Sequence, residues 1–274
     1  MLLILGIVIG LLLGLTGAGG SVFAVPLLIM IGGISIHEAV TLSLAAVAAI
    51  TLYGSVRNLT KQTILWLPAA LLAGSGILAA PLGKVLGTML SETILMAGFS
   101  ILAILIAIRM WLTATTMPEA SKVVRGSHLS LESTNGLLCK FSPTGQFQMR
   151  PKCMSGLLLG GLMVGLLSGL FGVGGGFLII PLLLLLSQIS MIQAVSTSLV
   201  VIALISSSGF IAHIVLGETT HLSLVSLAWL ITGGLLGMFA GQLLSHRIAN
   251  ASLQKIFAIG LMAVSALMLF TQLI

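Results

Sequence analysis

The sequence predicts an all-α membrane protein, a polytopic helix bundle built from two homologous halves. Apolar residues make up 58% of the 274 residues and charged residues only 6%, whereas a water-soluble domain carries about 25% charged residues. The apolar residues form long segments separated by short polar ones, which is typical of membrane helices and not of barrel strands with their alternating period. A long stretch of sequence also occurs twice.

The repeated stretch defines the two halves. Residues 6–28 read GIVIGLLLGLTGAGGSVFAVPLL and residues 161–183 read GLMVGLLSGLFGVGGGFLIIPLL, with 12 of 23 positions identical at a constant offset of 155. A fixed internal offset indicates a duplicated structural unit. We therefore predict a first transmembrane repeat, a polar loop and a second transmembrane repeat, over residues 1–112, 113–153 and 154–274.

Each half contains five apolar segments, and a full crossing of the bilayer needs about 20 apolar residues. By this measure the third, fourth and fifth segments of each half cross the membrane. The first two are short, and we expect half-helices or a tilted pair, so that about eight to ten apolar segments build the bundle. The segments are 1–15, 20–34, 39–56, 64–82 and 93–112, then 155–170, 175–189, 191–212, 222–243 and 253–273.

Glycine recurs at every fourth position in the first segment of each half. This spacing places small residues along one helix face, where they let two helix backbones approach closely. We interpret these glycines as packing residues; they are Gly6, Gly10 and Gly14, and Gly161, Gly165 and Gly169.

The loop between the halves sets the predicted orientation. It carries five basic residues against Glu119 and Glu132, and the positive-inside rule therefore places it in the cytoplasm. If the stretch 155–189 then makes an even number of passes, the two halves have opposite orientations, as in many secondary transporters. The alternative is four parallel spans per half, which would leave Arg247 and Lys255 outside. We favour the inverted repeat.

A glycine cluster interrupts each copy of the repeat. We call residues 17–21 the first break and residues 172–176 the second break. Glycine lets the chain leave a helix and restart, because it tolerates positive φ. The restarted helix exposes backbone N–H groups with partial positive charge, which can hold an anion without Lys or Arg. The candidate residues are Gly17, Gly19, Gly20 and Ser21, and Gly172, Gly174, Gly175 and Gly176.

Matched hydroxyl residues open the third segment of each half. Hydroxyl groups in apolar helices often bond back to the preceding turn of their own helix. The functional interpretation is that they meet the glycine breaks at mid-depth of the bilayer and form a polar pocket. The candidates are Ser43 in the first half and Ser196, Thr197 and Ser198 in the second.

The distribution of acidic residues favours an anion. A cation site would need carboxylates inside the membrane, but all five acids lie at segment ends or in loops: Glu38, Glu92, Glu119, Glu132 and Glu218. Two alternatives remain open from the residues: a non-transporting membrane scaffold that needs the glycines only for packing, and a permease for another small anion or a metal ion.

Motifs of other functional classes are missing from the sequence. The glycine clusters lack the third glycine of a dinucleotide-binding loop and the Lys-Ser or Lys-Thr of a phosphate-binding loop. The five histidines show no metal-ligand spacing. We therefore predict no enzyme activity, no catalytic residue, no cofactor and no metal, and we interpret the net charge of +6 as a topology signal and not as nucleic-acid binding. Cys139 and Cys153 are expected to be free thiols.

The two stretches GLTGAGGSVFAVPLL and GLFGVGGGFLIIPLL, each followed by Ala-Val-(Thr/Ser)-x-Ser, resemble the duplicated signature of the sulfite exporter TauE/SafE family of bacterial membrane permeases. The resemblance covers the chain apart from the 113–153 loop, which is long for the family. It implies a multi-pass protein of the bacterial inner membrane that exports sulfite, sulfonates or related sulfur-containing anions. The family's glycine and hydroxyl motifs fall on the candidate residues of the two breaks and of the third segments.

The predicted partners are therefore a small anionic substrate and the lipid bilayer. The sequence leaves open which anion is carried and in which direction. It also leaves open coupling to a proton or another ion, and assembly into a homo-oligomer.

Overall fold

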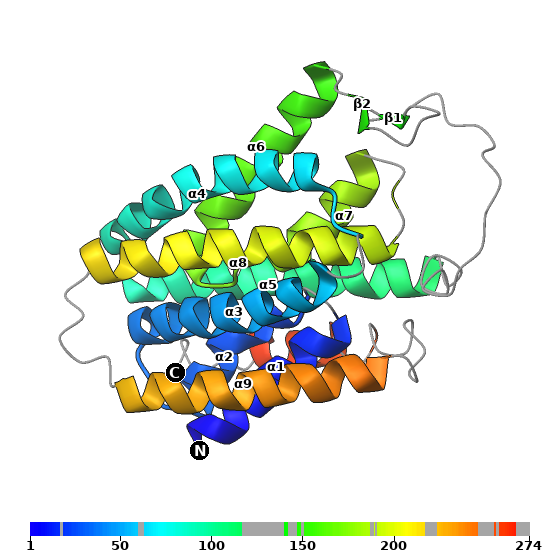
Figure 1. Cartoon of the computed structure of the whole chain (residues 1–274). Coiled ribbons are helices and arrows are strands. Elements are labelled where there is room, and N and C mark those ends of the chain that lie inside the picture. The colour runs from blue at the N-terminus through cyan, green and yellow to red at the C-terminus, as the bar shows by residue number, and fades with distance from the viewer. Residues whose placement is uncertain are drawn as a thin grey trace.

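The computed structural model is a bundle of long helices (Figure 1), which confirms the all-α membrane class. The residues described are 1–16, 19–59, 63–116, 140–141, 147–148, 151–186, 189, 191–216, 224–245, 255 and 258–266.

The first half of the bundle contains one short 3₁₀ helix, η1, and five α-helices. They are α1 (Leu2–Thr16), η1 (Gly19–Phe23), α2 (Ala24–Met30), α3 (Ile36–Leu59), α4 (Trp66–Met89) and α5 (Glu92–Thr116).

The second half follows a two-stranded hairpin, β1 (Lys140–Phe141) and β2 (Phe147–Gln148). Residues 258–266 are also helical. The labelled helices of this half are α6 (Pro151–Phe171), α7 (Gly176–Leu186), α8 (Met191–Leu216) and α9 (Leu224–Ser245).

Six of the described helices are long and apolar enough to cross a membrane: α3, α4, α5, α6, α8 and α9. The prediction was right for the third to fifth segments of the first half and the third and fourth of the second. Most of the fifth segment of the second half lies outside the described residues. The prediction of a short first segment in the second half is wrong, because α6 begins already at Pro151, and proline is well suited to the first position of a helix.

The third helices of the two halves, α3 and α8, form the centre of the bundle. Leu44 of α3 lies against Gly209 of α8 and Gly54 of α3 lies against Leu199 of α8, so the two helices run antiparallel. Figure 1 shows them between α4 on one side and α9 on the other. This one matched pair of helices therefore points in opposite directions.

The first helix of each half packs against the fourth helix of the other half: α1 on α9, and α6 on α4. Gly10 faces the backbone of Gly234, and Gly165 faces the backbone of Gly76. Both pairs run parallel, and an added side-chain carbon at either α1 or α6 glycine would overlap the partner's main chain. This confirms the packing role predicted for the glycines at every fourth position.

The prediction of a free thiol is wrong for Cys153, which is disulfide-bonded. The only other cysteine of the chain is Cys139. Strands β1 and β2 pair Lys140 with Gln148, three residues before α6 begins, and Cys139 itself lies outside the described residues.

Candidate functional site

The second break interrupts the chain between α6 and α7. Helix α6 ends at Phe171 and α7 begins at Gly176. Three residues of the break, Gly172, Gly174 and Gly175, have φ values of 71°, 68° and 69°. Residues with a side chain adopt this left-handed region at a cost of about 1–2 kcal/mol each. The glycine cluster is therefore what permits the restart of the helix, as the sequence predicts.

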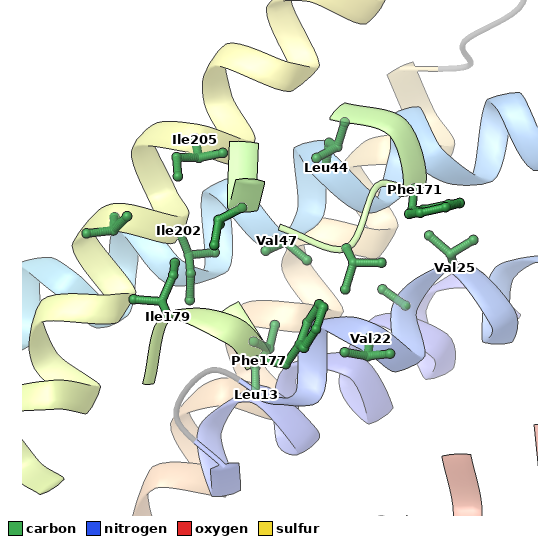
Figure 2. Packing of buried hydrophobic residues seen from close by; sticks show 14 of the residues in the cluster. Leu13, Val22, Val25, Leu44, Val47, Phe171, Phe177, Ile179, Ile202 and Ile205 are labelled. Atoms are coloured by element: carbon green, nitrogen blue, oxygen red, sulfur yellow. The ribbon is translucent and has the colours of Figure 1, made fainter. Parts of the chain in front are cut away.

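The break lies at the level of the middle of the two central helices. A Cβ added to Gly174 would lie 2.9 Å from Cγ1 of Val47, near the middle of α3, and 3.2 Å from Cγ2 of Ile202, near the middle of α8. Figure 2 shows the apolar side chains of this region, with Val47 and Ile202 close to the segment between Phe171 and Phe177. The residues of the break are all buried.

The backbone N–H groups of residues 173–177 are the main chemical feature of the break. None of the five donates a hydrogen bond to an acceptor within the described part of the chain. Buried backbone N–H groups are almost always paired, with protein, water or a ligand. Five successive unpaired donors at the start of a helix form a concave, partially positive surface that suits an anion.

Two serine hydroxyls add to this set of donors. The Oγ atoms of Ser206 on α8 and Ser168 on α6 are buried and have no hydrogen-bond partner among the described residues. A Cβ on Gly174 would lie 2.9 Å from the Oγ of Ser206. Ser168 lies one turn after Val164, whose side chain faces Gly175, so the two share a face of α6.

Sequence reasoning missed both serines. Comparison of the halves at the offset of 155 matches Ser168 with Leu13 and Ser206 with Thr51. For Ser168 the hydroxyl appears in one copy only and stands out in that alignment, whereas Ser206 is matched by another hydroxyl residue, so the alignment gives no signal for it.

Ser43 is the predicted hydroxyl residue that reaches a break. Its Oγ donates a 2.7 Å hydrogen bond to the carbonyl oxygen of Gly172, and it is fully buried. Ser43 belongs to the first half and Gly172 to the second, so this bond ties α3 to the second break. It also occupies a carbonyl that would otherwise present negative charge to an anion.

The first break has a different structure. Gly17 lies outside the described residues, and Gly19 begins η1. The Oγ1 of Thr16 accepts a 2.8 Å hydrogen bond from the N–H of Gly20 and donates one to the carbonyl of Leu12. Ser21 is fully buried and has a bonding partner. Helix η1 contacts α7, so the two breaks are neighbours, but the first one is closed by its own side chain.

The remaining predicted hydroxyls lie away from the second break. Ser196 accepts a 2.8 Å hydrogen bond from Thr63, and Thr197 accepts a 3.1 Å bond from the N–H of Leu65. These contacts fasten the start of α8 to the connection between α3 and α4. Ser198 bonds back to the carbonyl of Val195 in its own helix.

The described helices bring few charged groups near the second break. Glu38 and Glu92 are exposed at helix starts, and no group of three metal-ligating side chains occurs among the described residues. Two basic side chains, His213 on α8 and Lys84 on α4, are buried. The surroundings of the break thus combine neutral donors with basic groups.

Comparisons with known proteins identify the family of the chain. The family model described as "Sulfite exporter TauE/SafE" matches residues 2–268. A "Probable membrane transporter protein" of Xylella fastidiosa (strain 9a5c) is 27% identical over 95% of this chain and 90% of its own length. Two proteins of Bacillus subtilis (strain 168) also match. "Probable membrane transporter protein YunE" is 27% identical over 86% of each chain, and "Probable membrane transporter protein YdhB" is 26% identical over 93% of this chain and 94% of its own.

No solved structure gives a significant match to this chain. The family match covers nearly the whole sequence and both breaks. The chain therefore belongs to the sulfite exporter TauE/SafE family, and it is a bacterial multi-pass membrane transporter and not an enzyme.

Proposed function

We propose that this protein is a secondary carrier that exports small sulfur-containing anions such as sulfite or small organosulfonates, and that the anion binds at the second break. The observation that carries the proposal is the row of five backbone N–H groups at residues 173–177 that have no acceptor among the described residues, with the Ser206 hydroxyl, likewise without a partner there, beside it. The class of anion rests on the family to which the chain belongs.

The chemistry of the site suits transport. The oxygens of a sulfite or sulfonate group accept hydrogen bonds, and the break offers a run of N–H donors, while two of its carbonyls are engaged: that of Gly172 by Ser43 and that of Gly175 by Leu178. Neutral amide and hydroxyl donors can replace the water around an anion without holding it as firmly as a buried Lys or Arg pair would. Such a site can select an anion and still release it.

The arrangement of the halves supports alternating access. Matched helices α3 and α8 run antiparallel, as an inverted repeat requires, and the break lies at the level of their middles. In carriers of this kind the substrate site lies at the interface of the repeats, near mid-depth, and rocking of one half against the other exposes it to each side. Helix α1 packs against α9 of the second half, and α6 packs against α4 of the first half. Each rocking unit would therefore contain helices of both repeats.

The side on which the 113–153 loop lies remains a prediction from its basic residues, which place it in the cytoplasm. The disulfide of Cys153 points the other way, because disulfides persist in oxidising compartments. We give more weight to the charge rule, because it rests on five basic residues of the loop. Labelling of the two cysteines with an impermeant thiol reagent, after reduction, decides the side.

The decisive experiment measures anion uptake into proteoliposomes for sulfite, sulfate, thiosulfate and methanesulfonate. It compares the wild type with Ser206→Ala and with the control Ser100→Ala. Ser100 of α5 is also a fully buried serine without a hydrogen-bond partner among the described residues, and its neighbour Phe99 packs edge-on against Phe171 at the end of α6, so it controls for a buried hydroxyl in the same region. Both substitutions therefore remove the same kind of group.

We expect wild-type and Ser100→Ala proteins to carry sulfite or methanesulfonate, and Ser206→Ala to bind it about tenfold or more weakly, because a hydrogen bond to a charged group contributes about 1.5–3 kcal/mol. Equal flux in the two variants would contradict the site. Absence of flux for all four anions in the wild type, with no anion-dependent stabilisation, would contradict the carrier function and favour a scaffold.

A further inference from the structure

We propose that His213 binds a proton together with the anion, so that the protein couples anion movement to proton movement. This inference deepens the proposed function and rests on it. It is carried by the position of His213 between the two elements that hold the second break, and by a hydrogen-bond arrangement that accommodates either charge state.

His213 connects both sides of the second break. Its side chain is 3% exposed. The Nε2 atom lies 3.0 Å from the carbonyl oxygen of Gly169, just before the break on α6. The Nδ1 atom lies 3.2 Å from the Oγ1 of Thr41, two residues before Ser43 on α3. Ser43 in turn bonds to Gly172, so one imidazole touches both supports of the break.

The neutral form of His213 is fully hydrogen-bonded. A carbonyl oxygen can only accept, so Nε2 carries a proton and donates it to Gly169. The Nδ1 atom is then an acceptor, and the hydroxyl of Thr41 can donate to it.

The protonated form is also fully hydrogen-bonded. In that form Nδ1 donates to the Oγ1 of Thr41. The hydroxyl of Thr41 then turns to its second partner, the carbonyl oxygen of His37, at 2.9 Å. Rotation of one hydroxyl therefore satisfies every polar atom before and after protonation, without a change of side-chain position.

The charges around His213 explain why an anion would favour its protonation. Two basic residues lie on the elements around it: Lys84 of α4 follows Gly83, which faces Gly169, and His37 of α3 lies one turn before Thr41. Glu38 on α3 is exposed at the helix start, α7 has no titratable residue, and α6 has only Lys152, at its opposite end, because Cys153 is disulfide-bonded.

No carboxylate among the described residues therefore offsets a positive charge on the imidazole. An anion in the break would offset it. Each ligand would then raise the affinity for the other, and by thermodynamic linkage the effect is reciprocal.

The first half carries no equivalent proton site. At the offset of 155, His213 is matched by Asn58, which does not titrate. One proton per anion is therefore the expected stoichiometry for the break that we assign as the binding site.

The test uses methanesulfonate in proteoliposomes, because its acid group stays ionised over the physiological pH range and cannot itself carry the proton. A pH difference is imposed across the membrane and the accumulation of the anion is measured. His213→Gln keeps a polar side chain that does not titrate. His37→Gln removes the neighbouring histidine and serves as the matched control.

Coupling of one proton to one anion makes a difference of about one pH unit equivalent to about a tenfold accumulation ratio. We expect the wild type and His37→Gln to reach this ratio. His213→Gln should equilibrate the anion without accumulating it.

Thr41→Val keeps the histidine but removes the hydroxyl that serves both charge states, and we expect it to lower the accumulation ratio as well. This second variant tests the inference if His213→Gln fails to fold. Two results would overturn this inference but leave the proposed function standing. One is anion flux in the wild type that does not depend on the pH difference, and the other is tenfold accumulation by a folded His213→Gln protein. Absence of all anion flux in the wild type would overturn the proposed function and this inference with it.

Discussion

The two glycine breaks share one sequence pattern but have different structures. In the first break the N–H of Gly20 is bonded to the side chain of Thr16, and a 3₁₀ helix continues the chain at once. In the second break five successive N–H groups have no acceptor in the described part of the chain. A duplicated motif has thus produced one closed break and one open break.

Four matched positions account for the difference. Thr16, which closes the first break, is matched by Phe171, which has no hydroxyl. Ser168 and Ser206 have no hydrogen-bond partner in the part of the chain that the structure describes. They are matched by Leu13 and by Thr51, and the Thr51 hydroxyl bonds to its own helix at 2.6 Å. Ser21 is matched by Gly176. We infer that the first break serves folding and the second serves binding, and the following predictions test this division, from the largest expected effect to the smallest.

Alanine at a glycine of each break should separate the two roles most clearly. A Cβ on Gly20 would lie 2.5 Å from main-chain atoms of Leu12 and Leu13, which cannot move aside easily. We expect Gly20→Ala to lower the free energy of unfolding by about 3 kcal/mol, as for other overpacked sites.

A Cβ on Gly174 would meet only side-chain atoms, so Gly174→Ala should cost about 1–2 kcal/mol of backbone strain but abolish anion binding. Thermal unfolding in detergent and anion flux are the two measurements. If both variants lost anion flux in the same proportion to the stability that they lose, the result would contradict the division of roles.

The matched hydroxyls Ser206 and Thr51 provide a second comparison. Ser206→Ala removes an unpaired buried group and should raise stability by about 1 kcal/mol while weakening anion binding about tenfold or more. Thr51→Ala removes a hydroxyl that already has a partner in its own helix, and it should leave anion affinity unchanged. Melting temperature with and without anion reports both quantities, and loss of affinity in both variants would count against the second break as the single site.

Ser43 and Ser198 occupy equivalent positions in the two halves. Ser43→Ala leaves the buried carbonyl of Gly172 without its 2.7 Å donor, and we expect a loss of about 1–3 kcal/mol. Ser198 bonds only within its own helix, so Ser198→Ala should cost less than about 0.5 kcal/mol. Denaturation of the purified proteins measures the difference, and equal costs would show that the contact between α3 and the break is unimportant for stability.

The cap of the first break should have the smallest effect. Thr16→Val keeps the shape of the side chain but removes the acceptor for the Gly20 N–H, which by analogy with helix caps costs about 1 kcal/mol. Anion affinity should not change. Reduced affinity without reduced stability would assign the first break a direct part in binding.

The sequence predicted the class, the repeat and the interruptions, because composition and glycine patterning act locally. It named Ser43, whose hydroxyl contacts Gly172 of the second break, and its part in binding stays a prediction. It could not place Ser196 and Thr197, whose partners Thr63 and Leu65 lie in a distant connection.

Sequence reasoning missed Ser168 on α6 and Ser206 on α8, because a serine in an apolar helix usually bonds to its own backbone. The exchange of α1 and α6 between halves was also beyond reach, since a glycine face indicates close packing but not the partner.

The central claim is that an anion binds to the backbone N–H groups of the second break. The most direct measurement is an experimental structure determined with selenite, a heavier analogue of sulfite, whose selenium can be located by anomalous scattering. We predict a selenium peak within hydrogen-bonding reach of the N–H groups of Gly175 and Gly176 and of the Ser206 hydroxyl. A bound selenite elsewhere in a protein that transports sulfite, with the second break empty, would contradict the account.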